Sequence, residues 1–115
     1  MHEISLVRNI FATLESEFSA AELQNLTAID LRVGLLSNVE PALMQNAFTA
    51  VTSAEEKFQA AKLNVEIVPI KIYCESCDKH SLINNYKFSC ANCGTPNNNV
   101  VQGTELLIHR VHFKD

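Results

Sequence analysis

The sequence is poor in residues that interrupt or loosen a chain. Its 115 residues include three glycines, three prolines and no tryptophan. No stretch approaches the roughly 20 consecutive apolar residues that a transmembrane helix needs. No run of five or more like charges occurs, and the net charge is −4, so a polyanion has no evident surface to bind. Low-complexity, membrane-spanning and nucleic-acid-binding classes are therefore disfavoured.

The first twenty residues also lack the basic head, apolar centre and small-residue cleavage site of a secretory signal. We therefore expect a cytoplasmic protein whose thiols stay reduced. The composition, 47 % apolar and 19 % charged, is typical of a globular chain. This length allows one domain with a small satellite, burying roughly two-thirds of the unfolded surface.

Hydrophobic spacing predicts two helices. From His2 to about Ala20, apolar residues recur at steps of four, three and four, which places them on one helical face. They are Val7, Phe11, Leu14 and Phe18. A second helix is predicted from Pro41, which suits a first helical turn. Its expected apolar stripe comprises Leu43, Met44, Ala47, Phe48 and Val51. Ser53 and Glu56 have capping-box spacing, so a new turn after this helix stays open.

Three segments read as strands. Residues 27–36 alternate apolar and polar, with Ile29, Leu31, Val33 and Leu35 on the apolar side. Residues 63–73 alternate through Leu63, Val65 and Ile67 until Pro69, where an edge or bend is expected. Residues 104–113 form the last strand. We expect the second and third strands to pair with each other.

These elements predict an α+β fold in which a three-stranded sheet is covered by two helices. A small zinc-ribbon-like module with four cysteines is inserted into it. The predicted domains are residues 1–73 with 100–115, which form the α/β part, and residues 74–99, which form the small module.

All four cysteines lie in CxxC pairs. Twelve residues separate the two pairs, which are Cys74 with Cys77 and Cys90 with Cys93. Each such turn brings two sulfurs to one ion, and two turns complete the tetrahedral thiolate shell that Zn²⁺ prefers. Gly94, directly after the second pair, suits a tight turn. We predict a Zn(II) site, with an iron site or a redox dithiol as alternatives.

Such a zinc site is expected to be structural. Four thiolates leave no open coordination position for water or substrate. The segment is too small to fold on its own core, so metal binding would supply much of its folding free energy. His80, three residues beyond Cys77, is an alternative ligand, although a solvated loop histidine is the simpler interpretation. His109 and His112 are expected to be surface or core residues rather than a second site.

The chain opens with a histidine and a glutamate beside the terminal amine. Taken alone, His2 indicates no more than a frayed chain start. However, the Met1 amine, the His2 backbone nitrogen and the His2 imidazole can close fused chelate rings, and nitrogen-rich planar shells suit Ni²⁺ and Cu²⁺. Glu3 adds an amide nitrogen or a carboxylate. The bulk of His2 should also protect Met1 from removal.

Several further motifs occur in a fixed order along the chain. They are MHE at 1–3, VGLLSNVEP at 33–41 with the following AF at 47–48, VEIVP at 65–69, the two CxxC pairs and GTEL at 103–106. With this ordered set, essentially the whole chain resembles the HypA/HybF family, the nickel metallochaperones of hydrogenase maturation.

The resemblance implies a carrier that delivers Ni(II) to the nickel-iron hydrogenase large subunit, and in some members to urease, with a maturation GTPase as partner. It implies nickel held at the N-terminus by His2 and neighbouring backbone nitrogens, and structural zinc held by the four cysteines. Met1 and Glu3 are the adjoining nickel candidates. Glu40 is a further candidate by position, although the helix dipole alone also favours a carboxylate there.

Two segments depart from the family pattern. Many relatives have a glycine-containing GTxAEGA turn where this chain reads TSAEEKFQAA, at residues 52–61. Relatives also commonly have CPxCG at the second cysteine pair, where this chain has Ala91. The first difference leaves the local turn open. The second alters the stiffness of its turn but not the ligands.

The resemblance therefore predicts a nickel metallochaperone. We do not expect an enzyme, because no nucleophile, open zinc position or paired carboxylates can be identified. The alternative is a zinc-ribbon adaptor that binds another protein and whose MHE start is accidental. Near the cysteines, lysine side chains are offset by acidic ones, so neither nucleic acid nor a membrane is an expected partner.

Nickel affinity is expected to weaken as the pH falls from 8 to 5.5. The proposed chelate needs a neutral imidazole and a deprotonated amine, whose reference pKa values are about 6.5 and about 7.7 to 8.0, so protons compete for both donors. Calorimetric titration of untagged protein across this range measures the effect. Equal affinity at both ends of the range would contradict a chelate made by the chain terminus.

Overall fold

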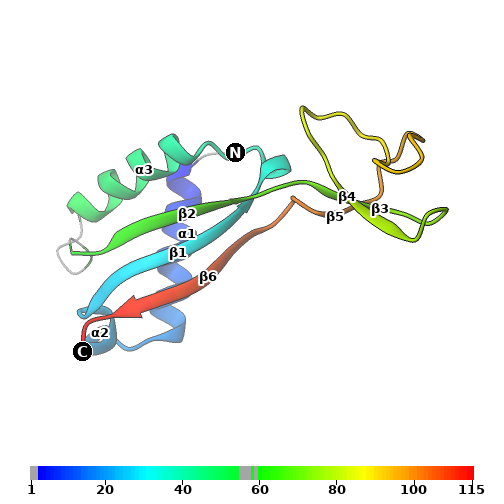
Figure 1. The fold of residues 1–115 in the computed structure, drawn as a ribbon. Helices are drawn as coiled ribbons and strands as arrows, with labels where there is room; N and C mark the ends of the chain where they lie inside the picture. The colour runs from blue at the N-terminus through cyan, green and yellow to red at the C-terminus, as the bar shows by residue number, and fades with distance from the viewer. Residues whose placement is uncertain (1–2, 55–57, 59) are drawn as a thin grey trace. The chain divides into compact units, whose positions relative to one another are not determined.

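The computed structural model describes residues 3–54, 58 and 60–115, and the chain divides into two units (Figure 1). Unit 1 comprises residues 1–31, 38–66 and 107–115, and unit 2 comprises residues 32–37 and 67–106. Neither unit is a continuous segment, since the chain passes between them four times. The domains predicted from sequence stay a prediction, because a division by contacts does not test which part folds alone.

The elements confirm the α+β class. The helical ones are α1 (Glu3–Glu17), α2 (Ala20–Leu23), a single 3₁₀ turn η1 (Leu35–Ser37) and α3 (Pro41–Ala54). The strands are β1 (Leu26–Gly34), β2 (Lys62–Val68), β3 (Lys71–Cys74), β4 (Lys79–Leu82), β5 (Val100–Gln102) and β6 (Leu106–Phe113). They form two three-stranded sheets, ordered β2-β1-β6 and β4-β3-β5. No helix among the described residues is long and apolar enough to cross a membrane.

The first sheet has β1 at its centre, so the expected pairing of the second and third predicted strands is wrong. β2 runs in the same direction as β1 (Figure 1), and α3 provides the crossover that a parallel pair requires. β6 returns antiparallel on the other edge, where the Thr27 hydroxyl donates to the His112 carbonyl. Sequence patterns mark strands but do not rank the possible neighbours, which explains the error.

The second sheet belongs to unit 2 and supports the cysteine segment. β3 pairs antiparallel with both β4 and β5, so the strands directly beside that segment do meet. Behind this sheet, Ile70, Ile72 and Ile83 form a small buried cluster. The inserted module expected from the sequence is therefore a three-stranded ribbon on a very small apolar core.

Helix α1 buries the face that its spacing predicted. Val7, Phe11 and Leu14 are buried, whereas the helix ends at Glu17, before Phe18. The predicted helix end near residue 20 is therefore too late. A short second helix, α2, follows because Ser19 and Glu22 form a reciprocal capping box.

Helix α3 packs against α1 on one side of the sheet (Figure 1). The Phe11 ring stacks on Phe48, with centroids 5.6 Å apart, and on Phe58, with centroids 4.3 Å apart. Leu43 was expected in the buried stripe but is 50 % exposed, and Thr52 is buried instead. Thr52 is tolerated there because its hydroxyl donates to the Phe48 carbonyl. Ser53 lies within α3, and Glu56 lies outside the described residues.

The predicted alternation in residues 63–73 fails at its centre. Leu63 is buried as expected, but Ile67 is 40 % exposed and Val68 is buried. β2 ends at Val68 and β3 begins at Lys71, so the expected bend coincides with Pro69. The chain changes sheets here, which shifts the buried side by one residue.

The end of β1 also differs from the prediction, because Leu35 lies in η1 and is 41 % exposed. Here Gly34 donates its N–H to the Glu105 carbonyl at 2.6 Å, and Leu36 donates to the Gly103 carbonyl at 2.7 Å. A Cβ added at Gly34 would overlap the Gly103 backbone. Glycine at position 34 thus permits this close approach of two backbones.

Gly34→Ala is expected to destabilise the metal-loaded protein by about 4 kcal/mol or more, because two backbones would have to separate. Gly94→Ala is the matched control. A Cβ there meets nothing within 4 Å, and its φ of +74° costs only about 1 to 2 kcal/mol. Urea unfolding measures both free energies. Equal losses would show that the contact between residues 34 and 103 does not constrain the fold.

Candidate metal centre

The four cysteine sulfurs meet at one point of unit 2. All four Sγ atoms lie within 4.8 Å of one another. The Cys74 and Cys93 sulfurs are 3.9 Å apart, and so are those of Cys77 and Cys90. Bonds of about 2.3 Å from Zn²⁺ to sulfur would place the corners of a tetrahedron about 3.8 Å apart. The cluster therefore has the dimensions of a tetrahedral thiolate site and can hold a metal ion.

Each CxxC pair is followed directly by a residue with a left-handed backbone conformation. Asp78 follows the first pair with φ of 53°, and Gly94 follows the second with φ of 74°. The Gly94 N–H donates to the Cys90 carbonyl at 2.8 Å, which closes the second turn. Sequence reasoning identified Gly94 but missed Asp78, because aspartate occurs in many backbone conformations, although it does tolerate this one.

The second turn is anchored to strand β4 by a hydrogen bond from a backbone N–H to a side-chain hydroxyl. The Ala91 N–H donates to the Ser81 hydroxyl at 3.1 Å, and Ser81 is buried. Proline, the residue that the family resemblance leads one to expect at position 91, has no N–H and could not make this bond. Alanine at position 91 thus allows a hydrogen bond where proline would restrict the backbone with its ring, and the four cysteine ligands are unchanged.

Polar groups around the sulfurs favour their thiolate forms. The Asn92 amide donates to the Cys77 sulfur at 3.2 Å, and the Thr95 hydroxyl lies 3.3 Å from the Cys93 sulfur. Hydrogen bonds from Thr95 lower the pKa of Cys93 to about 6. Backbone bonds from Cys93 and Asn92 lower the pKa of Cys90.

The pKa of Cys77 is raised, in contrast to the pKa values of Cys90 and Cys93. The Asn92 amide lowers the pKa of Cys77, but the neighbouring thiols and burial outweigh it and raise that pKa to about 11. A bound cation would displace the proton of the Cys77 thiol, because thiolate is the form that ligates metal. Asn92 and Thr95 were not identified from the sequence, where no spacing rule marks donors to sulfur.

The cluster is unevenly exposed. Cys74 and Cys90 are buried, Cys77 is intermediate and Cys93 is exposed. Below it, the chain is held by the Asn97 amide, which donates to the Tyr73 carbonyl at 2.9 Å, and by the sheet described above. One corner therefore faces water while the other three rest on the module.

The residues predicted at the nickel end lie in unit 1. Met1 and His2 lie outside the described residues. Glu3 is the first residue of α1 and is partly buried. Glu40 is exposed, and its carbonyl accepts the Met44 N–H at the start of α3. A shallow hollow of about 350 Å³ joins Glu3 to the first turns of α3.

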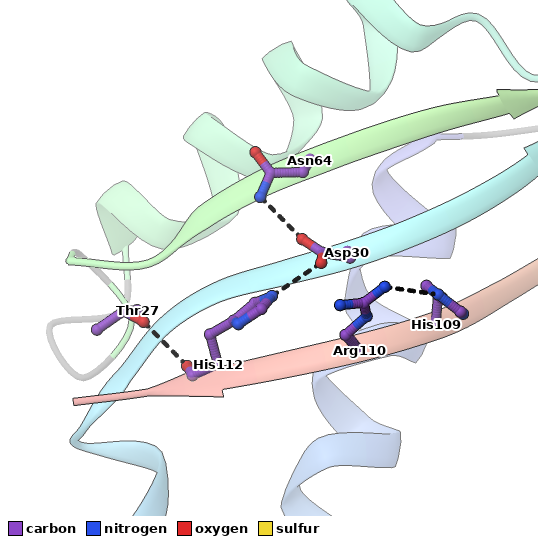
Figure 2. A network of polar contacts seen from close by, with 6 residues as sticks. All are labelled: Thr27, Asp30, Asn64, His109, Arg110 and His112. Atoms are coloured by element: carbon purple, nitrogen blue, oxygen red, sulfur yellow. Dashed lines mark hydrogen bonds and ion pairs between the residues drawn. The ribbon is translucent and has the colours of Figure 1, made fainter. Parts of the chain in front are cut away.

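None of the other described histidines belongs to the group of clustered metal ligands. The His80 ring packs against Tyr73, with centroids 5.2 Å apart, and His80 is not among the clustered ligands of the described chain. His109 contacts Arg110, and His112 contacts Asp30 (Figure 2). All three are exposed, as expected for surface histidines.

Comparison with known proteins gives one consistent result. The family described as "Hydrogenase/urease nickel incorporation, metallochaperone, hypA" matches residues 1–113. Hydrogenase maturation factor HypA of Shewanella baltica is 29 % identical over 99 % of this chain and 97 % of its own. The protein of the same name from Desulfitobacterium hafniense is 29 % identical over the full length of both chains.

Two solved structures share the fold. The solution structure of a HypA protein superposes with a TM-score of 0.70 at 20 % identity, covering 99 % of this chain and 97 % of that one. The solution structure of the Helicobacter pylori nickel metallochaperone HypA gives a TM-score of 0.65 at 20 % identity, covering 98 % and 97 %.

Cobalt(II), whose visible spectrum reports tetrahedral thiolate coordination, is expected to bind the four cysteines. Cys90→Ser should abolish the four-thiolate spectrum, because a buried corner is lost. Asn92→Ala should keep that spectrum and weaken affinity by about tenfold, the usual cost of losing a group that supports a ligand. Competition against a chromophoric chelator measures affinity. A four-thiolate spectrum that survives Cys90→Ser would refute the assignment.

Proposed function

Because the chain belongs to the HypA family of hydrogenase and urease nickel metallochaperones, we propose that it binds Ni²⁺ at its N-terminus and delivers it to a nickel enzyme. The observation that carries the proposal is a family match over residues 1–113 in a chain that retains His2 and the complete cysteine set. As in the family description, nickel is cargo here, and the protein acts as a carrier.

The start of α1 supports the nickel site. Glu3 follows Met1 and His2 directly in the chain and is the first described residue of α1. Its backbone nitrogen and its carboxylate can each join a chelate formed by the terminal amine and the His2 ring. A cation at a helix N-terminus opposes the helix dipole, and the Glu3 carboxylate offsets that repulsion. The site proposed consists of Met1, His2 and Glu3.

Glu40 is proposed as a further carboxylate near this site. It stands directly before α3, and the hollow described above joins Glu3 to Leu43, one turn into that helix. Its side chain is exposed and can approach a cation at little desolvation cost. Loss of Glu40 should therefore weaken nickel binding without abolishing it.

The cysteine cluster is proposed to hold structural Zn²⁺. The two 3.9 Å sulfur distances match a tetrahedral zinc site, and four thiolates complete the shell. Binding the ion adds folding free energy to a unit whose buried apolar cluster comprises only three isoleucines. Zinc thus fixes the module, whereas nickel binds and leaves through a site with fewer constraints.

Delivery is proposed to occur in the cytoplasm. The large subunit of nickel-iron hydrogenase is the proposed recipient, urease is a second one, and a maturation GTPase is the proposed partner. Ligands at the end of the chain can be exchanged one at a time, which allows a receiving enzyme to take over the ion stepwise. Restoration of hydrogenase activity in a strain that lacks its own HypA tests this role.

His2→Gln is expected to abolish tight nickel binding and leave zinc content unchanged, because the imidazole is lost while the cysteines are intact. Glutamine is preferred to alanine because its bulk should keep Met1 in place. His109→Gln is the matched control, since His109 is exposed and outside the proposed site. Elemental analysis and calorimetry on untagged protein measure both metals.

One retained zinc and one exchangeable nickel in the unmodified protein and in His109→Gln would support the carrier. Unchanged nickel binding in His2→Gln would overturn the terminal site. Zinc without any nickel binding in the unmodified protein would instead favour the adaptor alternative.

A further inference from the structure

The sheet of unit 1 carries a polar network on the face away from the helices (Figure 2). One residue from each strand contributes: Asn64 from β2, Asp30 from β1 and His112 from β6. The His112 Nε2 lies 2.8 Å from Asp30 Oδ2, and the Asn64 amide donates to Asp30 Oδ1 at 2.8 Å. The two outer strands therefore orient both oxygens of one carboxylate.

The side chains of this network are accessible. The His112 side chain is 44 % exposed and that of Asp30 is 25 % exposed. Hydrogen bonds from His112 and Asn64 lower the pKa of Asp30, so this carboxyl is ionised at neutral pH. An imidazole and a carboxylate are thus held together on a solvent-facing surface, and each has a donor atom that binds divalent transition metals.

The spacing of the two atoms suits joint coordination. Adjacent ligands of an octahedral ion with bonds of about 2.1 Å lie about 3.0 Å apart, close to the separation of Nε2 and Oδ2. Binding moves the imidazole proton from Nε2 to Nδ1, and a rotation of the exposed His112 side chain would turn the freed Nε2 lone pair from Asp30 Oδ2 toward the ion. The proposed binding involves no oxidation, reduction or covalent modification.

We propose that His112 and Asp30 form a second, low-affinity site for Ni²⁺ on the outer face of the unit 1 sheet. His112 Nε2 and Asp30 Oδ2 are its protein ligands, and water completes the shell. Asn64 is a positioning residue, because its amide holds the other carboxylate oxygen. This site is independent of the N-terminal chelate and uses none of its residues.

The charges around the pair explain a low affinity. The positive charge of Arg110 acts on Asp30 and would repel a cation. Arg110, Glu66 and His109 line an open hollow of about 410 Å³ that begins at Asp30, so the ion would stay hydrated. A site of this kind collects ions at high nickel concentration and releases them quickly. Arg110→Gln should therefore strengthen binding severalfold.

A plain ion pair that only joins β6 to β1 is the competing explanation. An ion pair predicts that Asp30→Asn changes stability but has no effect on metal binding. The metal site predicts that Asp30→Asn, which keeps the shape of the side chain, reduces nickel affinity in a protein that is still folded. The two explanations are thus separated by a metal titration and not by stability.

The experiment titrates NiCl₂ into zinc-loaded, full-length protein at pH 7.5 and records amide resonances in two-dimensional ¹H–¹⁵N spectra. Paramagnetic broadening locates the ion. In His2→Gln protein, broadening is expected around residues 30, 64 and 112. His112→Gln and Asp30→Asn should each raise the nickel concentration needed by about tenfold or more. His109→Gln is the matched control and should leave it unchanged.

Broadening that centres on residues 30 and 112 and disappears in both variants supports the site. Broadening that is absent from these residues, persists in His112→Gln or depends on His109 overturns it. Failure of the N-terminal site is a separate result, because it would leave residues near 3 unaffected by nickel in the unmodified protein while the outer-face titration stays readable.

Discussion

The requirement that four sulfurs meet at one point determines the architecture of unit 2. Two CxxC turns, twelve residues apart in sequence, must face each other, and each needs a left-handed residue directly after it. Their cluster rests on a sheet whose described residues include a small apolar cluster of Ile70, Ile72 and Ile83. An apolar cluster this small contributes little folding free energy. A metal ion bound by the four thiolates would supply much of the remainder.

Local patterns in the sequence predicted the parts of the fold that depend on local physics. The α1 face with Val7, Phe11 and Leu14 follows from helical spacing, and the cysteine convergence follows from the two CxxC turns. Strand neighbours could not be predicted this way, because β1 selects its partners through contacts far apart in the chain. The change of sheets at Pro69 likewise depends on packing in two places at once.

The candidate sites show the same division. The four sulfur ligands were evident from spacing, whereas the groups that support them, Asn92, Thr95 and Ser81, come from the folded arrangement. Such supporting groups have no sequence signature, since asparagine, threonine and serine are common in any loop. The pairing of Asp30 with His112, 82 positions later, was invisible for the same reason.

The interrupted order of the two units has a consequence for biosynthesis. Because β6 follows residues 67–106 in the chain, the sheet of unit 1 stays incomplete on the ribosome until that insertion and β6 have been made. Residues 67–106 emerge before it, and pairing of β3 with β5 draws the ends of that insertion together. The entropic cost of closing this loop is therefore already met before β6 docks. Pairing within the ribbon therefore lowers the entropic cost of bringing β6 to β1, and a metal ion held by the four cysteines would strengthen this effect by stabilising the ribbon.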